Sequence, residues 1–200
     1  MHHQLTSSRT QVFHPSRGTS PSLVVFTAVD GAIRQSASGS CVAARRAIDL
    51  LESRGVPVVL TSLDSAHEMV ALQQDFGERH PFVCDGGRTL YVPRGFFTDL
   101  QDLWPNDEEW HVVPLGVADV ARAVRLLVSL FQVSGDDVLT VGLGCAWSDR
   151  RMLEAVDVPI IVRGDAPDQA RLRRTLPAAY LTTASGPAGW CEAVLGSIPT

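Results

Sequence analysis

Polar side chains and a glycine-rich segment follow three short apolar runs, and together they could carry out phosphoryl chemistry. Asp30 follows the first run, Thr61 and Ser62 follow the second, and a glycine-rich segment ending at Asp149 follows the third. Carboxylate and hydroxyl oxygens are ligands that Mg²⁺ accepts. If the three runs are neighbouring parallel strands, the arrangement is typical of a magnesium-dependent phosphoryl-transfer site.

The elements that must position these residues alternate between strand and helix from Ser22 onward. Buried strands appear as short continuous apolar runs, and helices as apolar residues at three- and four-residue spacing. The predicted strands span 23–31, 57–60, 81–84, 89–92, 138–141, 158–162 and 180–182, and the predicted helices span 43–55, 64–76, 118–131, 148–155, 167–176 and 187–195, the second with Asp64 as its N-cap. This alternation predicts an α/β fold, with a mainly parallel sheet between helices in a three-layer, Rossmann-like domain.

Length and composition narrow the function classes. With 200 residues, 45% hydrophobic, 20% charged and a net charge of −5, the chain fits one acidic globular domain. We expect a flexible tail over 1–21 and a single domain over 22–200, no nucleic-acid partner, and no membrane span, because no apolar run approaches 20 residues. The four cysteines form no CxxC pair, which favours reduced thiols in the cytoplasm.

All 17 basic residues are arginine, because the chain contains no lysine. Mechanisms that need a lysine ammonium or amine are therefore excluded, among them the P-loop and Schiff-base chemistries.

Four segments resemble a known family. They are 25–31 (Val-Phe-Thr-Ala-Val-Asp-Gly), 58–62 together with 81–83, 142–153 together with 156–159, and 183–190. The chain resembles the haloacid dehalogenase-like (HAD) hydrolases, and within them the mannosyl-3-phosphoglycerate phosphatase group, whose Gly-Pro-x-Gly-Trp ending is similar to 186–190. The resemblance implies a HAD core, a phosphatase activity and a magnesium cofactor.

The same resemblance assigns roles to single residues, and several residue types depart from the family pattern. Ala28 stands where the family has its aspartate nucleophile, and Asp30 stands at the general acid/base position. The implied metal positions are Asp30, Asp149 and Cys145, with Cys145 in place of an aspartate, and Thr61 and Ser62 are the implied phosphate-binding residues. Since a thiol is a poor ligand for Mg²⁺, we expect weak metal binding.

Two further features of the family, a lysine and a cap domain, have no equivalent in this sequence. The phosphate-neutralising lysine has no counterpart, although Arg122 or Arg125 on the predicted helix 118–131 could reach the site. Residues 93–117 are too few to build the α/β cap that the family inserts there, so the cap is largely absent. We therefore expect a site open to water.

Three functions follow as hypotheses. The leading one is a catalytically silent phosphatase-like domain that binds a small phosphorylated ligand or a protein. An alternative is an active magnesium-dependent phosphatase of sugar phosphates or phosphoglycerates with a site rebuilt around Asp30, in which Cys145 has a lowered pKa and serves as nucleophile or as ligand of a softer metal. The third is an interaction module, homodimeric or with another protein, using the aromatic residues of 96–110, which otherwise fold back over the strand ends.

Other residues are given structural roles. His67, His80 and His111 show no metal-ligand spacing. Trp190 is expected to anchor the last helix.

Overall fold

The computed structural model describes residues 11–12, 23–34, 42–74, 76, 78–97, 109–132 and 137–197. Its strands are β1 (Gln11–Val12), β2 (Leu23–Ala28), β3 (Val58–Thr61), β4 (Glu78–Arg79), β5 (Phe82–Cys84), β6 (Thr89–Pro93), β7 (Trp110–Pro114), β8 (Leu139–Gly144), β9 (Val158–Arg163) and β10 (Tyr180–Ser185). Its helices are α1 (Val42–Ser53), α2 (Ala66–Gln73), α3 (Val120–Gln132), the 3₁₀ helix η2 (Trp147–Asp149), α4 (Arg150–Leu153), α5 (Ala166–Thr175) and α6 (Gly186–Ser197).

Eight strands form one sheet in the order β10-β9-β8-β2-β3-β5-β6-β7. The strands from β10 to β5 are parallel to one another, β6 runs antiparallel to β5, and β7 runs antiparallel to β6. After β2 the chain adds β3 on one side, and it later returns to place β8 on the other side. The strand order therefore reverses at β2, and ligands of open α/β sheets bind at such a switch point.

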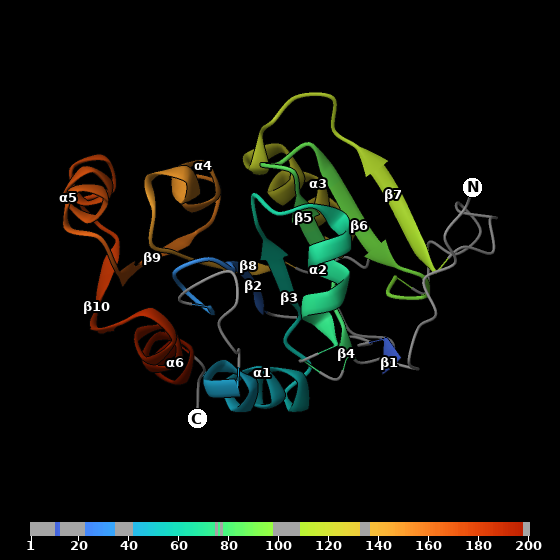
Figure 1. The fold of residues 1–200 in the computed structure, drawn as a ribbon, viewed down its shortest axis with the longest axis horizontal. Helices are drawn as coiled ribbons and strands as arrows, with labels where there is room; N and C mark the ends of the chain where they lie inside the picture. Colours follow the sequence, from blue (N-terminus) through green and yellow to red (C-terminus); the bar gives the residue numbers. More distant parts are fainter. Residues whose placement is uncertain are drawn as a thin grey trace.

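Helices cover both faces of this sheet. Helices α1 and α6 pack together on one face, whereas α3 and α4 pack together on the other (Figure 1). Every residue of β2 is buried, as the continuous apolar run at 23–26 predicts for a strand covered on both faces. The predicted three-layer α/β fold with a mainly parallel sheet is confirmed.

The boundaries of the first two helices show where local sequence determines structure. Helix α1 ends before Gly55, which adopts a φ of +68° as the predicted stop signal requires. Helix α2 is capped by Ser65, which accepts a hydrogen bond from the Glu68 N–H while the Glu68 carboxylate accepts one from Ser65 N. The predicted cap, Asp64, is wrong because its carboxylate is bound to Arg34 instead.

The region expected to replace the cap contributes to the sheet. Strand β7 pairs with β6 and extends the sheet beyond β5. The sequence did not predict β7, because its side chains alternate between buried and exposed rather than forming an apolar run. Residues 98–108, which include Trp104 of the predicted interface aromatics, lie outside the described residues.

The described aromatic residues on either side of that gap pack against the domain itself. The Phe96 ring lies 6.0 Å from that of Phe131 on α3. The Trp110 ring lies 5.1 Å from that of Phe82 and 6.4 Å from that of Tyr91. Both ends of the segment 96–110 therefore pack on the domain, but against α3, β5 and β6 and not over the strand ends, because none of these aromatic residues lines the cleft there.

Two residues of the range 1–21 form a strand. Strand β1 lies within the range 1–21 and pairs in parallel with β4 in a separate two-stranded sheet. The rest of that range lies outside the described residues.

None of the helices described here combines the length and the apolar character that crossing a bilayer would require.

Candidate functional site

A cleft of about 210 Å³ opens where β2, β3 and β8 end. The pairing of Ala28 with Thr61 places the ends of β2 and β3 level with each other. Five of the six residues singled out in the sequence line this cleft, namely Ala28, Asp30, Thr61, Ser62 and Asp149, and further lining comes from Leu63, Gly86, Val120, Ala146, Ser148 and Met152. The predicted convergence of the three strand ends is therefore present.

A tight loop after β2 presents Asp30 to the cleft. The Val29 carbonyl accepts hydrogen bonds from the N–H groups of Ile33 and Arg34, both at 3.0 Å. The Gly31 N–H donates to the Arg34 carbonyl at 2.6 Å, and Gly31 has a φ of +76°. A Cβ at position 31 would also collide with the Cys145 sulfur. Glycine is required here both by the turn and by the approach of β8.

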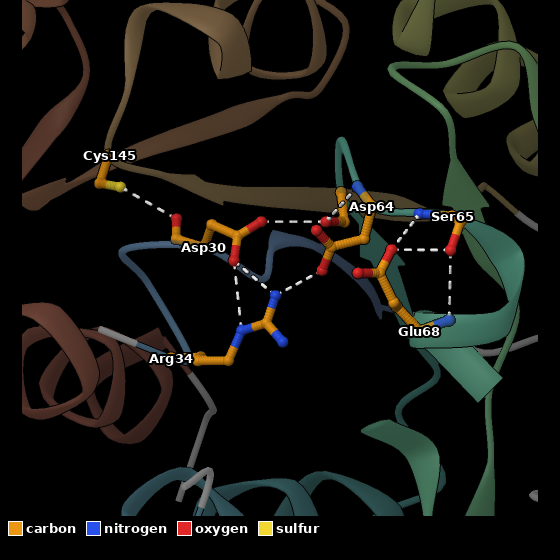
Figure 2. A network of polar contacts seen from close by, with 7 residues as sticks. Asp30, Arg34, Asp64, Ser65, Glu68 and Cys145 are labelled. Atoms are coloured by element: carbon orange, nitrogen blue, oxygen red, sulfur yellow. Dashed lines mark hydrogen bonds and ion pairs between the residues drawn. The ribbon is translucent and has the colours of Figure 1, made fainter. Parts of the chain in front are cut away.

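The Asp30 carboxylate is hydrogen-bonded through both of its oxygens (Figure 2). Oδ1 accepts from Arg34 Nη2 at 2.6 Å and from Nε at 3.2 Å, and Oδ2 accepts from Ser62 Oγ at 3.0 Å. Its side chain is 49% exposed, whereas that of Arg34 is 7% exposed. Asp30 thus faces the cleft while its cation partner is buried behind it.

Arg34 joins Asp30 to a second carboxylate, Asp64, which follows β3. Its Nη2 donates to Asp64 Oδ2 as well as to Asp30, so that one guanidinium bridges both acids (Figure 2). Burial alone lowers the pKa of Arg34, but the hydrogen bonds and charges of Asp30 and Asp64 outweigh it, and the pKa lies above its ordinary value. Sequence reasoning missed this network. The spacing of four residues between Asp30 and Arg34 is a weak signal for it, and Asp64 gives none.

Asp149 closes the turn between β8 and η2. Its Oδ2 accepts hydrogen bonds from Cys145 N at 2.8 Å and Ala146 N at 2.9 Å. Burial raises the pKa of Asp149, the two N–H groups work in the opposite direction, and the nearby charge of Asp30 adds to the increase. A Cβ on Gly144 would lie 2.6 Å from that of Asp149, so this turn closes only around a glycine.

Cys145 does not line the cleft. Its side chain is buried and its Sγ lies 3.3 Å from the Asp30 carbonyl oxygen (Figure 2). Burial, with smaller contributions from Asp149, Asp168 and Asp30, raises the pKa of the thiol to about 12. The alternative in which Cys145 has a lowered pKa is not supported, because burial among carboxylates raises that pKa and no described cation lies against the sulfur.

The hydroxyls expected to bind phosphate already have partners. Thr61 Oγ1 donates to the Thr27 carbonyl at 3.3 Å and is buried. Ser62 Oγ donates to Asp30, and it accepts from the Asp64 N–H at 3.0 Å. The Ser62 N–H donates to the Val83 carbonyl within the sheet. Phosphate binding here would therefore require several of these hydrogen bonds to exchange partners.

Neither arginine proposed to replace the lysine lines the cleft. Arg122 Nη1 donates to the Leu115 carbonyl at 2.8 Å. Arg125 lies 3.7 Å from Asp119 and borders a different hollow, beside the start of β8. The suggestion that either reaches the site is wrong, because Arg122 is bound to the Leu115 carbonyl and Arg125 lies beside Asp119.

The residues present do not fit Mg²⁺, which needs near-octahedral oxygen ligands at about 2.0–2.1 Å. Both oxygens of Asp30 and both of Asp149 accept hydrogen bonds from the protein, and Cys145 offers a buried thiol. Within the described ranges, no group of three or more His, Cys, Asp or Glu side chains is arranged to hold a metal ion. We propose no catalytic step through a metal.

Trp147 directly precedes Ser148 and Asp149, which line the cleft. Its N–H donates to Asp168 Oδ2 at 2.9 Å. The guanidinium carbons of Arg171 and Arg150 lie 4.1 Å and 4.8 Å from its ring centroid. These cation–π contacts and the hydrogen bond hold η2 against α4 and α5.

The three histidines and the tryptophan that the sequence also singled out do not line the cleft. His80 is fully buried and contacts Glu52 at 2.6 Å, His111 lies buried in β7, and His67 is exposed on α2. Trp190 is fully buried, and its Nε1 donates to Thr27 Oγ1 at 2.8 Å. Its predicted role as an anchor of the last helix agrees with this contact.

Structural comparison identifies the class of fold. The chain is similar to the HAD-like hydrolase yhjK from Bacillus subtilis, with a TM-score of 0.61 and 11% identity over 94% of this chain and 95% of that one. A HAD-like hydrolase from Bacteroides thetaiotaomicron gives a TM-score of 0.60 and 12% identity over 89% of this chain and all of the other. The fold is therefore that of the HAD-like hydrolases.

Sequence comparison points to one group of phosphatases with this fold, although no family model matches the chain. The glucosyl-3-phosphoglycerate/mannosyl-3-phosphoglycerate phosphatase of Methanococcoides burtonii is 20% identical over 271 aligned positions, which cover 88% of this chain and 97% of the relative. The phosphatase of the same name from Persephonella marina is 24% identical over 121 residues, covering 60% of this chain and 45% of the relative. The first alignment is longer than the chain, so that relative carries segments that have no counterpart here. The predicted resemblance to HAD phosphatases of this group is confirmed.

Proposed function

We propose that this chain has a HAD-like phosphatase fold without phosphomonoester hydrolysis, and that it acts by binding. The observation that carries the proposal is the methyl group of Ala28 at the end of β2, 3% exposed and lining the cleft where the family's nucleophile would stand. Loss of the nucleophile from a cooperating catalytic set can cost about 10⁶ in turnover.

The charge around the cleft supports the same proposal. Among the described residues, its lining carries the carboxylates of Asp30 and Asp149 and no basic side chain. A phosphate monoester would enter this field without a lysine and without a second cation, since Arg34 is already bound to two acids. Charge repulsion of this kind disfavours both binding and transfer of a phosphoryl group.

The ligand proposed for the cleft is a small molecule. A volume of about 210 Å³ lies below the range of roughly 300–1,000 Å³ that is usual for drug-sized ligands. The names of the relatives suggest the dephosphorylated products of glycosylated phosphoglycerates as the first compounds to screen, because the acidic lining disfavours the phosphate group itself. We further propose a cytoplasmic location, which the reduced, buried thiols of Cys84 and Cys145 support.

A second function is favoured by one observation. Asp30 is half exposed to the cleft, as a general base acting on water would need to be. A hydrolase rebuilt around Asp30 therefore stays the alternative. Its weakness is that Arg34 and Ser62 already occupy both carboxylate oxygens.

Phosphate release separates the two functions. We would measure it with a panel of sugar phosphates and phosphoglycerates in Mg²⁺, Mn²⁺ or Co²⁺, for the wild type, Asp30→Asn and, as a matched control, Asp49→Asn, an exposed carboxylate on α1. We expect no release above the buffer rate from any of the three proteins. Metal-dependent turnover that Asp30→Asn abolishes and Asp49→Asn retains would overturn the proposal in favour of the hydrolase.

A further inference from the structure

The cleft at the strand ends carries more negative than positive charge. Asp30 and Asp149 line it, and Asp64 shares the guanidinium of Arg34 with Asp30 (Figure 2). This group contains three carboxylates and one guanidinium, so negative charge is in excess even when Asp149 holds a proton. The charge of Asp30 contributes to the raised pKa of Asp149, which shows that the two acids interact. A ligand therefore meets a negative electrostatic potential here.

The two arginines that follow Asp149 do not offset this excess, because acids already bind them. Arg151 lies 3.2 Å from Asp119 and 3.3 Å from Glu154, and Arg150 lies 3.7 Å from Glu154. Neither arginine lines the cleft. An anion bound in the cleft would have to draw one of them away from its acidic partner.

The hydrogen-bond donors of the lining are also in use. Its three hydroxyl groups all donate to acceptors of the protein, namely Ser62 to Asp30 at 3.0 Å, Thr61 to the Thr27 carbonyl at 3.3 Å and Ser148 to Asp149 at 3.4 Å. The backbone N–H groups of Ser62 and Gly86 donate to carbonyls, and that of Ala146 donates to Asp149. No other side chain of the described lining carries an N–H or O–H group when the acids are ionised.

Acceptor positions, in contrast, remain open. A carboxylate oxygen can accept two hydrogen bonds, and Asp30 Oδ2 accepts one, from Ser62. The Asp30 side chain is half exposed and lines the cleft, as does the exposed Ser148, whose hydroxyl oxygen can accept as well as donate. The side chains of the cleft can therefore accept hydrogen bonds from a ligand, but they have few to donate.

We propose that the ligand of this cleft is a small hydroxylated ammonium compound, such as an amino alcohol, and not an anion. An ammonium group has three N–H donors and no acceptor, and its hydrogen bonds to a carboxylate are roughly twice as strong as neutral ones. Apolar lining from Ala28, Val120 and Met152 would contact a short carbon skeleton. Neutral polyols rank second and anions last, so a glycosylated glycerate would enter with its hydroxyl groups and keep its carboxylate outside. This inference rests on the proposed binding function and names the class of ligand.

An NMR titration of the full chain tests this ranking. The probes are 3-amino-1,2-propanediol, glycerol and glycerate, which share a three-carbon skeleton and are positive, neutral and negative at neutral pH. At equal pH and ionic strength, we expect the amine to bind roughly tenfold more tightly than glycerol. Its amide shifts should include Gly86, Ala146 and Ser148, which line the cleft. Glycerate should cause no saturable shift of these amides.

A charge added at the cleft should change the ranking. Leu63 lines the cleft and is 68% exposed, so Leu63→Arg can place a cation there without disturbing the core. The matched control is Leu195→Arg, at a leucine of α6 that is 57% exposed and does not line the cleft. Leu63→Arg should weaken amine binding several-fold and make glycerate binding measurable, whereas Leu195→Arg should change neither.

The outcomes separate this inference from the proposed function. Glycerate that binds as tightly as the amine would overturn the inference, as would an amine that binds no better than glycerol, that shifts only amides outside the cleft or that does not bind. Each of these results would leave the proposed loss of hydrolysis intact. Release of phosphate in the assay above would instead overturn the proposed function, and the ranking of the three probes would still be measured by the same titration.

Discussion

Cys145 shows how surroundings decide the chemistry of a single side chain. A thiol between a glycine-rich turn and a helix can be activated, but here the sulfur is buried and lies near three carboxylates. Both effects disfavour the thiolate and raise its pKa to about 12. The position therefore belongs to the packing of the strand end, where the small thiol faces Gly31.

The burial of Cys145 near carboxylates predicts that this thiol is alkylated slowly. At pH 8 a thiol with a pKa of about 12 is ionised to roughly 1 part in 10⁴, whereas about a quarter of an ordinary thiol is ionised. Iodoacetamide should therefore modify Cys145 in the folded protein far more slowly than glutathione in the same tube, with urea removing the difference. Peptide mass spectrometry measures both rates. Modification of Cys145 as fast as glutathione would contradict the burial described here.

At the scale of elements, α6 is attached to the sheet at two places. On one side Trp190 reaches β2 through its hydrogen bond to Thr27, directly before Ala28. On the other side Glu192 accepts hydrogen bonds from the N–H groups of Thr183 and Ala184 in β10. The last helix therefore connects the site strand to the outermost strand of the parallel part of the sheet.

The first attachment predicts a large stability loss for Trp190→Phe. Removal of a fully buried indole and its hydrogen bond should lower the free energy of unfolding by roughly 2–4 kcal/mol. Urea unfolding would measure this loss, with Trp147→Phe as the control at a partly exposed tryptophan. The loss in the double variant Trp190→Phe/Thr27→Val should be smaller than the sum of the two single losses, because both changes remove the same hydrogen bond. A loss within about 0.5 kcal/mol of the control would show that the contact contributes little.

The second attachment predicts a pH dependence. Hydrogen bonds from the backbone N–H groups of Thr183 and Ala184 lower the pKa of Glu192. Since its folded pKa is depressed, its stabilising effect is present above the ordinary glutamate value of about 4.3 and is lost as pH falls through the lower folded value. The Tm difference between the wild type and Glu192→Gln should therefore be largest near neutral pH and shrink in acid.

Thermal scans across this pH range provide the check. Asp137→Asn removes an equal charge at an exposed position just before β8 and should show no such trend. A Glu192→Gln difference that stays constant down to strongly acidic pH would contradict the assigned hydrogen bonds.

At the scale of the whole molecule, the sequence predicts the parallel strands and their convergence well. Strands β2 and β3 are covered on both faces, so their apolar runs are continuous and visible, and β8 is buried from Thr140 onward. Strand β7 lies at the sheet edge with alternating exposure, and a five-residue alternation carries little signal. The family resemblance adds the interpretation of Ala28 as the nucleophile position and of Cys145 as a metal position. Residue types alone do not give either role.

The partners of the site residues could not be predicted in the same way. The contact between Arg34 and Asp64 joins residues 30 positions apart, and it exists only because β2 and β3 are adjacent. The raised pKa of Cys145 likewise depends on burial between β8 and the Asp30 loop. Long-range electrostatics of this kind follow from the fold, and no local spacing encodes them.

Trp147 gives the molecule an intrinsic optical reporter. Its ring lies against two guanidinium groups and its backbone immediately precedes two residues that line the cleft. A compound that enters the cleft would press on η2 and change the distance between the indole and those cations. Its emission spectrum should shift with occupancy, so unlabelled protein can be screened by fluorescence, with Trp147→Phe identifying which of the four tryptophans responds.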